Sequence, residues 1–188
     1  MRSSAKLVWS GGLIFLLALF SVSQAGPPAL TGNYNLAESK VSYTVNHAFK
    51  KATGISKSAK GKARCNAREC EVLIAVPVNT FDSGDSNRDL HMLETVRAAL
   101  FPVLTVRGNI ESSLLTKPSF TTQFEVEFAG KTATVSGVVL KLDAAGGVLK
   151  ATGSLTLRLS QFAIKPPSLL GLSVDDEVPI TFESTWQR

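Results

Sequence analysis

Apolar and polar residues alternate along much of this chain. Apolar residues occupy every second position in the segments 41–47, 72–78, 124–128, 155–159 and 178–182. This period puts successive side chains on opposite faces of a strand. About eight strands with short connections predict an antiparallel sheet that must close or stack to hide its edges.

One segment has the spacing of a helix instead. Apolar residues recur at helical intervals from Leu90 to Leu100, and Phe101-Pro102 follows as a stop signal. Ser86 can cap this helix, with Asp89 three residues later as in a capping box. We therefore expect one short helix among the strands.

The predicted fold is all-β with one short helix, an antiparallel β-barrel of about eight strands. Gly54 and Gly61 are expected to bend their strand, which a curled barrel needs more than a flat sandwich does. Such a barrel has room either for packed side chains or for one small ligand. Alternation turns a set of apolar residues inward, where each can be core or ligand contact. These are Tyr43, Val45, Val72, Ile74, Val76, Phe124, Val126, Phe128, Leu155, Leu157, Ile180, Phe182 and Trp186.

The first 25 of the 188 residues have the pattern of an export signal. Arg2 and Lys6 precede an apolar stretch at 7–20, and Ser23 and Ala25 are small residues suited to a signal peptidase. This stretch is too short to span about 30 Å of hydrocarbon as a helix. We expect residues 1–25 to be a cleaved signal peptide, with an uncleaved anchor as the alternative. Residues 26–188 would then form a single domain in the periplasm or outside the cell.

Cys65 and Cys70 are the only two cysteines, and they bracket four polar or small residues. In an oxidising compartment an even cysteine count most simply means a disulfide. The spacing differs from the C-x-x-C of thiol oxidoreductases, and there is no second pair for tetrahedral zinc. We expect a structural bridge that joins the two sides of a hairpin.

Candidate catalytic or metal-binding residues are few. His47 ends an apolar strand face, so it can be a buried structural histidine, a polar contact in a ligand cavity, or a catalytic base. His91 lies in the first turns of the predicted helix, where an Arg88–Asp89 tie is the simpler interpretation. The acidic loop at 82–89 lacks the spacing of a calcium-binding EF-hand. The sequence therefore predicts neither a metal site nor a cofactor.

Positive charge is concentrated in one segment. The segment from Lys50 to Arg68 contains seven lysines and arginines and no acidic residue. Lys60, Lys62 and Arg64 share one face of a strand, which suits transient contact with an anionic membrane surface. The alternative is a solvated strand that resists edge pairing. Export and the lack of interleaved aromatic residues exclude nucleic acid as the expected partner.

Several short motifs, taken in order, carry a family resemblance. They are Tyr43-Thr44-Val45-Asn46-His47 followed by Gly54 and Gly61, Phe81-Asp82-Ser83-Gly84, Arg88-Asp89-x-His91-Met92, Phe101-Pro102, Gly153-Ser154-Leu155-Thr156-Leu157, Phe162-Ala163-Ile164 and Asp176-Glu177-Val178. In this order and spacing they resemble the YceI-like lipid/polyisoprenoid-binding family over most of residues 26–188.

The resemblance implies a lipocalin-like barrel whose interior holds an isoprenoid or another lipid tail. It implies an exported protein that carries or sequesters this ligand, and it implies no catalytic reaction. Two other hypotheses stay open from the residues alone. One is a small hydrolase or isomerase that uses His47 as its base, and the other is a ligand-free interaction module that uses the basic strand.

Overall fold

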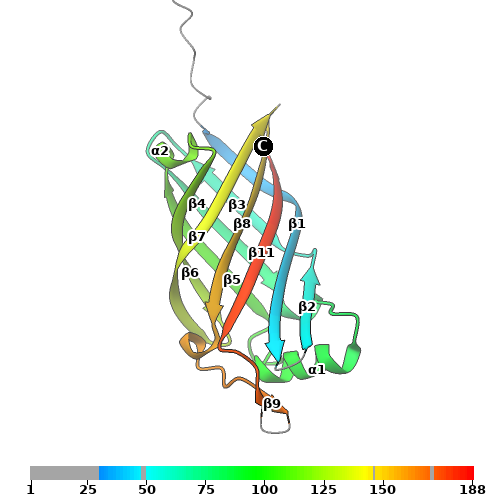
Figure 1. Cartoon of the computed structure of the whole chain (residues 1–188). Coiled ribbons are helices and arrows are strands. Elements are labelled where there is room, and N and C mark those ends of the chain that lie inside the picture. The colour runs from blue at the N-terminus through cyan, green and yellow to red at the C-terminus, as the bar shows by residue number, and fades with distance from the viewer. Residues whose placement is uncertain (1–29, 48–49, 146, 170–171) are drawn as a thin grey trace, which may run out of the picture.

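Antiparallel strands that wind into a closed barrel make up most of the structure (Figure 1). This computed structural model describes residues 30–47, 50–145, 147–169 and 172–188. The strands are β1 (Gly32–His47), β2 (Lys50–Ser56), β3 (Lys60–Cys65), β4 (Glu69–Pro77), β5 (Val103–Glu111), β6 (Ser119–Phe128), β7 (Lys131–Ala145), β8 (Val148–Arg158), β9 (Ser168–Leu169), β10 (Leu172–Ser173) and β11 (Glu177–Gln187). The helical elements are α1 (Ser86–Thr95), α2 (Ser112–Leu115) and the single turns η1 (Val78–Thr80) and η2 (Leu159–Phe162).

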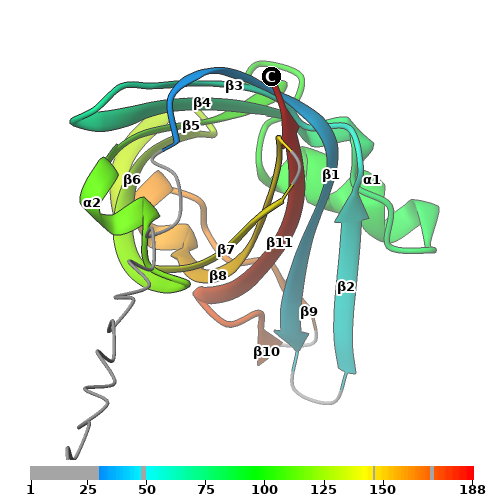
Figure 2. The same ribbon diagram turned by 90° about the horizontal axis from the view of Figure 1, so that it is seen from above.

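Eight of the strands form the barrel wall in the order β11-β8-β7-β6-β5-β4-β3-β1. The pairing of β1 with β11 closes the ring, and it runs from Asn35 opposite Gln187 to Tyr43 opposite Ile180. Figure 2 shows the ring from above, with β2 extending from β1 beyond the wall. The predicted fold, a closed antiparallel β-barrel with one short helix, is confirmed.

A bulge in β1 changes which residues face the interior. Ala37 is an extra residue of β1 relative to its partner β11. The residues that line the interior are therefore even-numbered before the bulge, Tyr34 and Leu36, and odd-numbered after it, Ser39 and Val41. One extra residue has this effect because side chains alternate strictly along a strand.

A second bulge does the same in β7. The pairing with β6 shifts in register here, and Gly137 has a φ of +75°. Glycine adopts this left-handed conformation without steric cost. Val135 lines the interior before the bulge, and Val138 and Leu140 line it afterwards.

Helix α1 forms where the sequence predicts it, with a different cap and a shorter length. Asp85, not Ser86, is the N-cap, and its carboxylate accepts from the backbone amides of residues 87 and 88. Asp89 instead accepts from the backbone amide of Ser83. The helix ends at Thr95, because Arg97 has a left-handed φ of +55°. The expectation of a helix as far as residue 100 was wrong.

The apolar face expected for this helix is only partly buried. Val96 is buried, whereas Leu90 is 55% exposed and Leu100 is 72% exposed. None of the helices in the described part of the chain is long and apolar enough to cross a membrane.

The lower end of the barrel in Figure 1 is closed by η2. Phe162 of this turn has no exposed surface, and its ring packs edge-on against Phe128 with 5.7 Å between ring centres. Ala129 and Val78 are also buried in the core here. Apolar packing thus blocks this end, and an interior space can only extend toward the other.

The expected disulfide between Cys65 and Cys70 is present at the β3–β4 hairpin. The two half-cystines are opposite each other in the strand register, and both are buried. The export signal expected at residues 1–25 lies outside the described residues.

Candidate functional site

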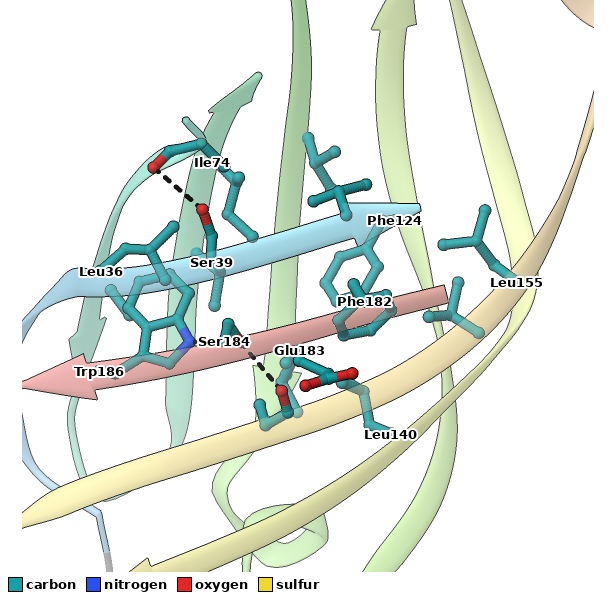
Figure 3. Close-up of a pocket in the computed structure, with 18 of the residues that line it drawn as sticks. Leu36, Ser39, Ile74, Phe124, Leu140, Leu155, Phe182, Glu183, Ser184 and Trp186 are labelled. Carbon is teal, nitrogen blue, oxygen red and sulfur yellow. Dashed lines mark hydrogen bonds between the residues drawn. The ribbon is translucent and has the colours of Figure 1, made fainter. Parts of the chain in front are cut away.

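A cavity of about 190 Å³ lies inside the barrel (Figure 3). Ten of the predicted ligand-binding residues line it: Val72, Ile74, Val76, Phe124, Val126, Leu155, Leu157, Ile180, Phe182 and Trp186. They come from strands on all sides of the ring, and each occupies an inward position of its strand. Alternation therefore placed most of the predicted residues correctly on the cavity wall, and the interior is not completely filled by side chains.

The other predicted residues lie elsewhere. Tyr43 stacks at a tilt against Phe81, with 5.4 Å between ring centres, and Phe128 packs at the closed end. Val45 packs against the core without lining the cavity. His47 pairs with Lys50 at the end of β1, and its side chain lies outside what the structure describes.

Two groups of lining residues could not be found by alternation. Tyr34 and Leu36 precede the bulge of β1, and Val138 and Leu140 follow the bulge of β7. In each of these two strands, the lining residues have even numbers on one side of the bulge and odd numbers on the other side. A glycine in a strand is a weak sequence signal for a bulge, and Gly137 is such a signal.

The cavity extends toward the upper end of the barrel in Figure 1. Leu30, Leu115 of α2 and Leu149 line it there, and all three are only half-buried. The opposite end is closed by Phe162. A ligand with a long apolar chain would thus lie along the barrel, with access from the upper end.

The polar side chains of the lining gather at one place on the wall. Ser39 of β1 and Ser184 of β11 are directly opposite each other in the strand pairing. Ser184 Oγ donates to the carbonyl oxygen of Ala151 at 3.1 Å and accepts from Trp186 Nε1 at 3.0 Å. Figure 3 shows these hydroxyls against a lining that is otherwise almost entirely apolar.

Burial raises the pKa of the Tyr43 phenol, and the charge of Asp89 raises it further while that of Arg88 opposes the shift. This tyrosine is therefore a neutral group at physiological pH and serves packing between β1 and the loop that precedes α1.

The acidic loop before α1 is used for local structure. Asp82 accepts from the backbone amide of Gly84 at 2.7 Å, Asp85 caps α1, and Asp89 accepts from the backbone amide of Ser83. His91 is exposed and contacts Glu94 at 3.3 Å, away from the cavity. Among the described residues, no three side chains of the His, Cys, Asp or Glu type are grouped to hold a metal ion.

The apolar cavity can remove an apolar chain from water. Such burial contributes about 25 cal/mol for each Å² of apolar surface. The cavity presents hydroxyl groups for hydrogen bonding at one point of the wall and apolar surface elsewhere. Apolar lining with few convergent polar groups is typical of a small-molecule binding site.

The sequence comparison identifies one family. The profile described as the YceI-like domain matches residues 33–186, which is the whole barrel wall except the first residue of β1 and the last residue of β11. No curated protein matches the chain.

Solved structures with the same fold are distant in sequence. BcnA of Burkholderia cenocepacia superposes with a TM-score of 0.66 at 20% identity, over 78% of this chain and 95% of its own. A polyisoprenoid binding domain from Saccharophagus degradans, implicated in plant cell wall breakdown, superposes with a TM-score of 0.65 at 13% identity. That match covers 82% of this chain and 97% of the domain. At such identities the likeness establishes the fold.

Proposed function

The chain belongs to the YceI-like family, and from this premise we propose that it binds an isoprenoid or another long apolar chain inside its barrel. The observation that carries this proposal is the apolar cavity of about 190 Å³, which remains open although the wall and the closed end are well packed. Transfer of an apolar chain from water into this space is favourable, and part of the gain is offset by the freedom that the chain loses. The name of the Saccharophagus degradans domain points to the same ligand class.

The same features support a binding role rather than a catalytic one. The cavity lining consists of apolar side chains, two serines and Glu183, with no histidine among the described lining residues. The ligand-binding residues that we propose are the ten predicted ones that line this cavity, with Tyr34, Leu36, Val138 and Leu140 added from the structure. The alternative of a hydrolase or isomerase uses His47 as its base, and the side chain of His47 lies outside what the structure describes.

We propose that the protein acts outside the cytoplasm, in the periplasm or secreted, as a carrier or sequestering protein. The Cys65–Cys70 bridge is consistent with an oxidising compartment. Residues 1–25 have the pattern of a cleaved signal, and residues 26–188 would be the single barrel domain. Intact-mass analysis of protein from the exported fraction should give a chain that begins at Gly26 and lacks free thiols.

Binding can be tested by replacing one small residue of the cavity wall with a large one, which fills the cavity. Ala151 lines the cavity, whereas the next residue of β8, Thr152, faces outward and is exposed. The variant Ala151→Phe should lose the lipid that solvent extraction and mass spectrometry recover from the purified protein. The matched control Thr152→Phe should retain it, because the ring lies outside the barrel.

Melting curves of both variants separate lost binding from lost folding. Overpacking of a core typically costs about 1–3 kcal/mol, which a folded barrel can tolerate. Equal lipid recovery from the two folded variants would contradict the proposal, as would the absence of extractable lipid from the parent protein and the failure of added isoprenoids to bind.

A further inference from the structure

The barrel wall is interrupted beside β1. Along the edge of β1 that does not pair with β11, residues 32–35 pair with β3 and residues 41–47 pair with β2. Within the described chain, none of the residues 36–40 between them is paired with either strand. They face the segment 57–61, where β2 ends and β3 begins. We call these two segments, Leu36–Lys40 and Lys57–Gly61, the wall gap.

A single long hydrogen bond crosses the wall gap among the described residues. Ser39 Oγ donates to the carbonyl oxygen of Ala59 at 3.5 Å, which is the limit of a hydrogen bond. Ala59 is buried and lines the cavity, as Ser39 does.

An outer groove of about 410 Å³ lies beside the wall gap and is lined by residues 37–40 of β1, residues 183–185 of β11 and Lys57. Ser39, Ser184 and Glu183 line both the groove and the cavity, so the apolar interior and a polar outer surface adjoin where β1 pairs with β11, next to the gap. A chain with a polar end could therefore keep its tail in the barrel and its end group at the gap.

The charges of the outer groove sum to zero. Glu38 and Glu183 provide two negative charges, and Lys40 and Lys57 provide two positive charges. Lys40 Nζ already lies 3.5 Å from Glu183 Oε1. The groove thus has no excess positive charge to offset an anionic end group, which would also have to approach two carboxylates.

Both serine hydroxyls have lone pairs left to accept hydrogen bonds, and Ser184 already uses its proton. A hydroxyl has one donor and two acceptor lone pairs. Ser184 Oγ gives its proton to Ala151 and one lone pair to Trp186 Nε1, so one lone pair remains. Ser39 Oγ keeps both lone pairs, and its hydrogen bond to Ala59 is long. The free capacity matches a ligand group that donates, and phosphate or carboxylate oxygens do not donate.

We propose that Ser39 and Ser184, which face each other on the cavity wall beside the wall gap, bind the uncharged hydroxyl end of a long-chain alcohol whose apolar tail occupies the cavity. This inference rests on the proposed function and adds the class of ligand. The ligand hydroxyl donates to Ser184 Oγ or Ser39 Oγ, and the tail contacts the apolar lining.

The test compares three probes with the same tail on the full chain: geranylgeraniol, its acetate ester and its monophosphate. The alcohol should bind about fivefold more tightly than the acetate, which lacks the donor, since one hydrogen bond has an effect of this size. It should also bind more tightly than the monophosphate, and this difference should persist at high salt.

Three serine variants locate the effect. At least one of the variants Ser184→Ala and Ser39→Ala should weaken binding of the alcohol by about threefold to tenfold and leave binding of the acetate unchanged. Ser154→Ala, on the exposed face of β8, is the matched control and should change neither. Ser39→Ala serves as the independent variant, because Ser39 makes no hydrogen bond to Trp186 and its loss does not disturb that ring.

Two results would overturn the inference while the proposed function stands. One is that the monophosphate or the acetate binds as tightly as the alcohol, and the other is that the serine variants weaken all three probes equally. If none of the three probes binds to the folded protein, both the inference and the proposed function are wrong.

Discussion

Single glycines decide where the aromatic rings of the barrel lie. A Cβ atom at Gly54 would overlap the ring of Tyr43, and one at Gly153 would overlap that of Phe182. Each of these pairs is directly opposite in the strand register. The rings therefore lie flat over their neighbouring strand rather than across the interior. For Phe182, which lines the cavity, this arrangement leaves space in the middle of the barrel.

Gly108 of β5 tests this role, because a Cβ atom there would overlap the ring of Phe124, which lines the cavity. The variant Gly108→Val should push that ring inward and lower the free energy of unfolding by about 1–3 kcal/mol, as overpacking does. Urea denaturation measures the change. The control Thr105→Val, on the outer face of the same strand, should stay within about 0.5 kcal/mol of the parent. An unchanged midpoint for the glycine variant would contradict this prediction.

Asp176 is the residue for which we predict a pH dependence. Its carboxylate accepts from the side-chain hydroxyl and the backbone amide of Ser160, each at 2.7 Å, and these hydrogen bonds lower its pKa. A carboxyl whose pKa is lower in the folded state stabilises the fold above its unfolded pKa, and this contribution is lost as the pH falls through the folded pKa. The variant Asp176→Asn should therefore unfold at lower urea than the parent at pH 7.

The same variant should approach the parent in acid, where the carboxyl of the parent is protonated. Urea midpoints at pH 7 and at pH values below the usual range of aspartate give the comparison. Asp175→Asn, at the adjacent exposed position, serves as the control and should show no such convergence. A constant difference between Asp176→Asn and the parent at all pH values would show that the hydrogen bonds, and not the charge, matter.

Among the elements, β1 organises the barrel because it has more partners than any other strand. One edge of it pairs with β11 from residue 35 to residue 43, and the other edge pairs with β3 and then with β2. At its beginning, Gly32 lies opposite Cys65, which is itself bonded to Cys70 of β4. The disulfide therefore stabilises the upper end of the barrel, where three strands meet and the cavity extends.

Removal of this disulfide should lower stability modestly. The variant Cys65→Ser with Cys70→Ser opens a loop of few residues, for which the chain-entropy model gives a loss of about 2 kcal/mol. The barrel should remain folded, because the β3–β4 pairing continues from Arg64 opposite Glu71 to Lys60 opposite Ala75. Chemical denaturation measures the loss of stability, and the far-ultraviolet circular dichroism spectrum shows whether the barrel remains folded. Loss of the strand signal in the absence of denaturant would contradict the expectation.

For the whole molecule, the distribution of charge over the outer surface suggests which side could approach a membrane. Lys60, Lys62 and Arg64 are all exposed on β3, as the strand parity predicted. Arg64 forms an ion pair with Glu71 at 2.6 Å, and no ion pair involves Lys60 or Lys62 among the described residues. Leu73 of β4, opposite Lys62, is 47% exposed. This face thus combines free positive charge with exposed apolar surface.

We expect this face to bind anionic vesicles. Each lysine near such a surface contributes about 1 kcal/mol, so Lys60→Glu with Lys62→Glu should greatly reduce sedimentation with vesicles that contain phosphatidylglycerol. The control Lys131→Glu with Lys141→Glu changes the net charge by the same amount, but on β7, across the barrel. Binding of the parent should also fall with added salt. Equal effects of the two double variants would leave net charge, rather than this face, as the cause.

The sequence by itself determined the barrel, its longest helix α1 and ten of the residues that line the cavity. These follow from local rules, because alternation assigns each residue of a strand to one face and turn residues separate the strands. The segments around Val72–Val76, Phe124–Val126 and Ile180–Phe182 obey those rules and line the cavity as predicted. The cysteine pair was predictable for a similar reason, since only two cysteines could combine.

Only the tertiary structure decided which face each strand segment presents beyond a bulge, and whether the interior stays open. Ala37 looks like any strand residue in the sequence, yet as an extra residue it exchanges the faces of Tyr34 and Ser39 relative to simple alternation. The wall gap arises because β1 changes partners, which depends on residues distant in the chain. Whether a cavity remains depends on how side chains from all strands together fill one shared volume. The sequence pattern of a single strand does not determine that filled volume.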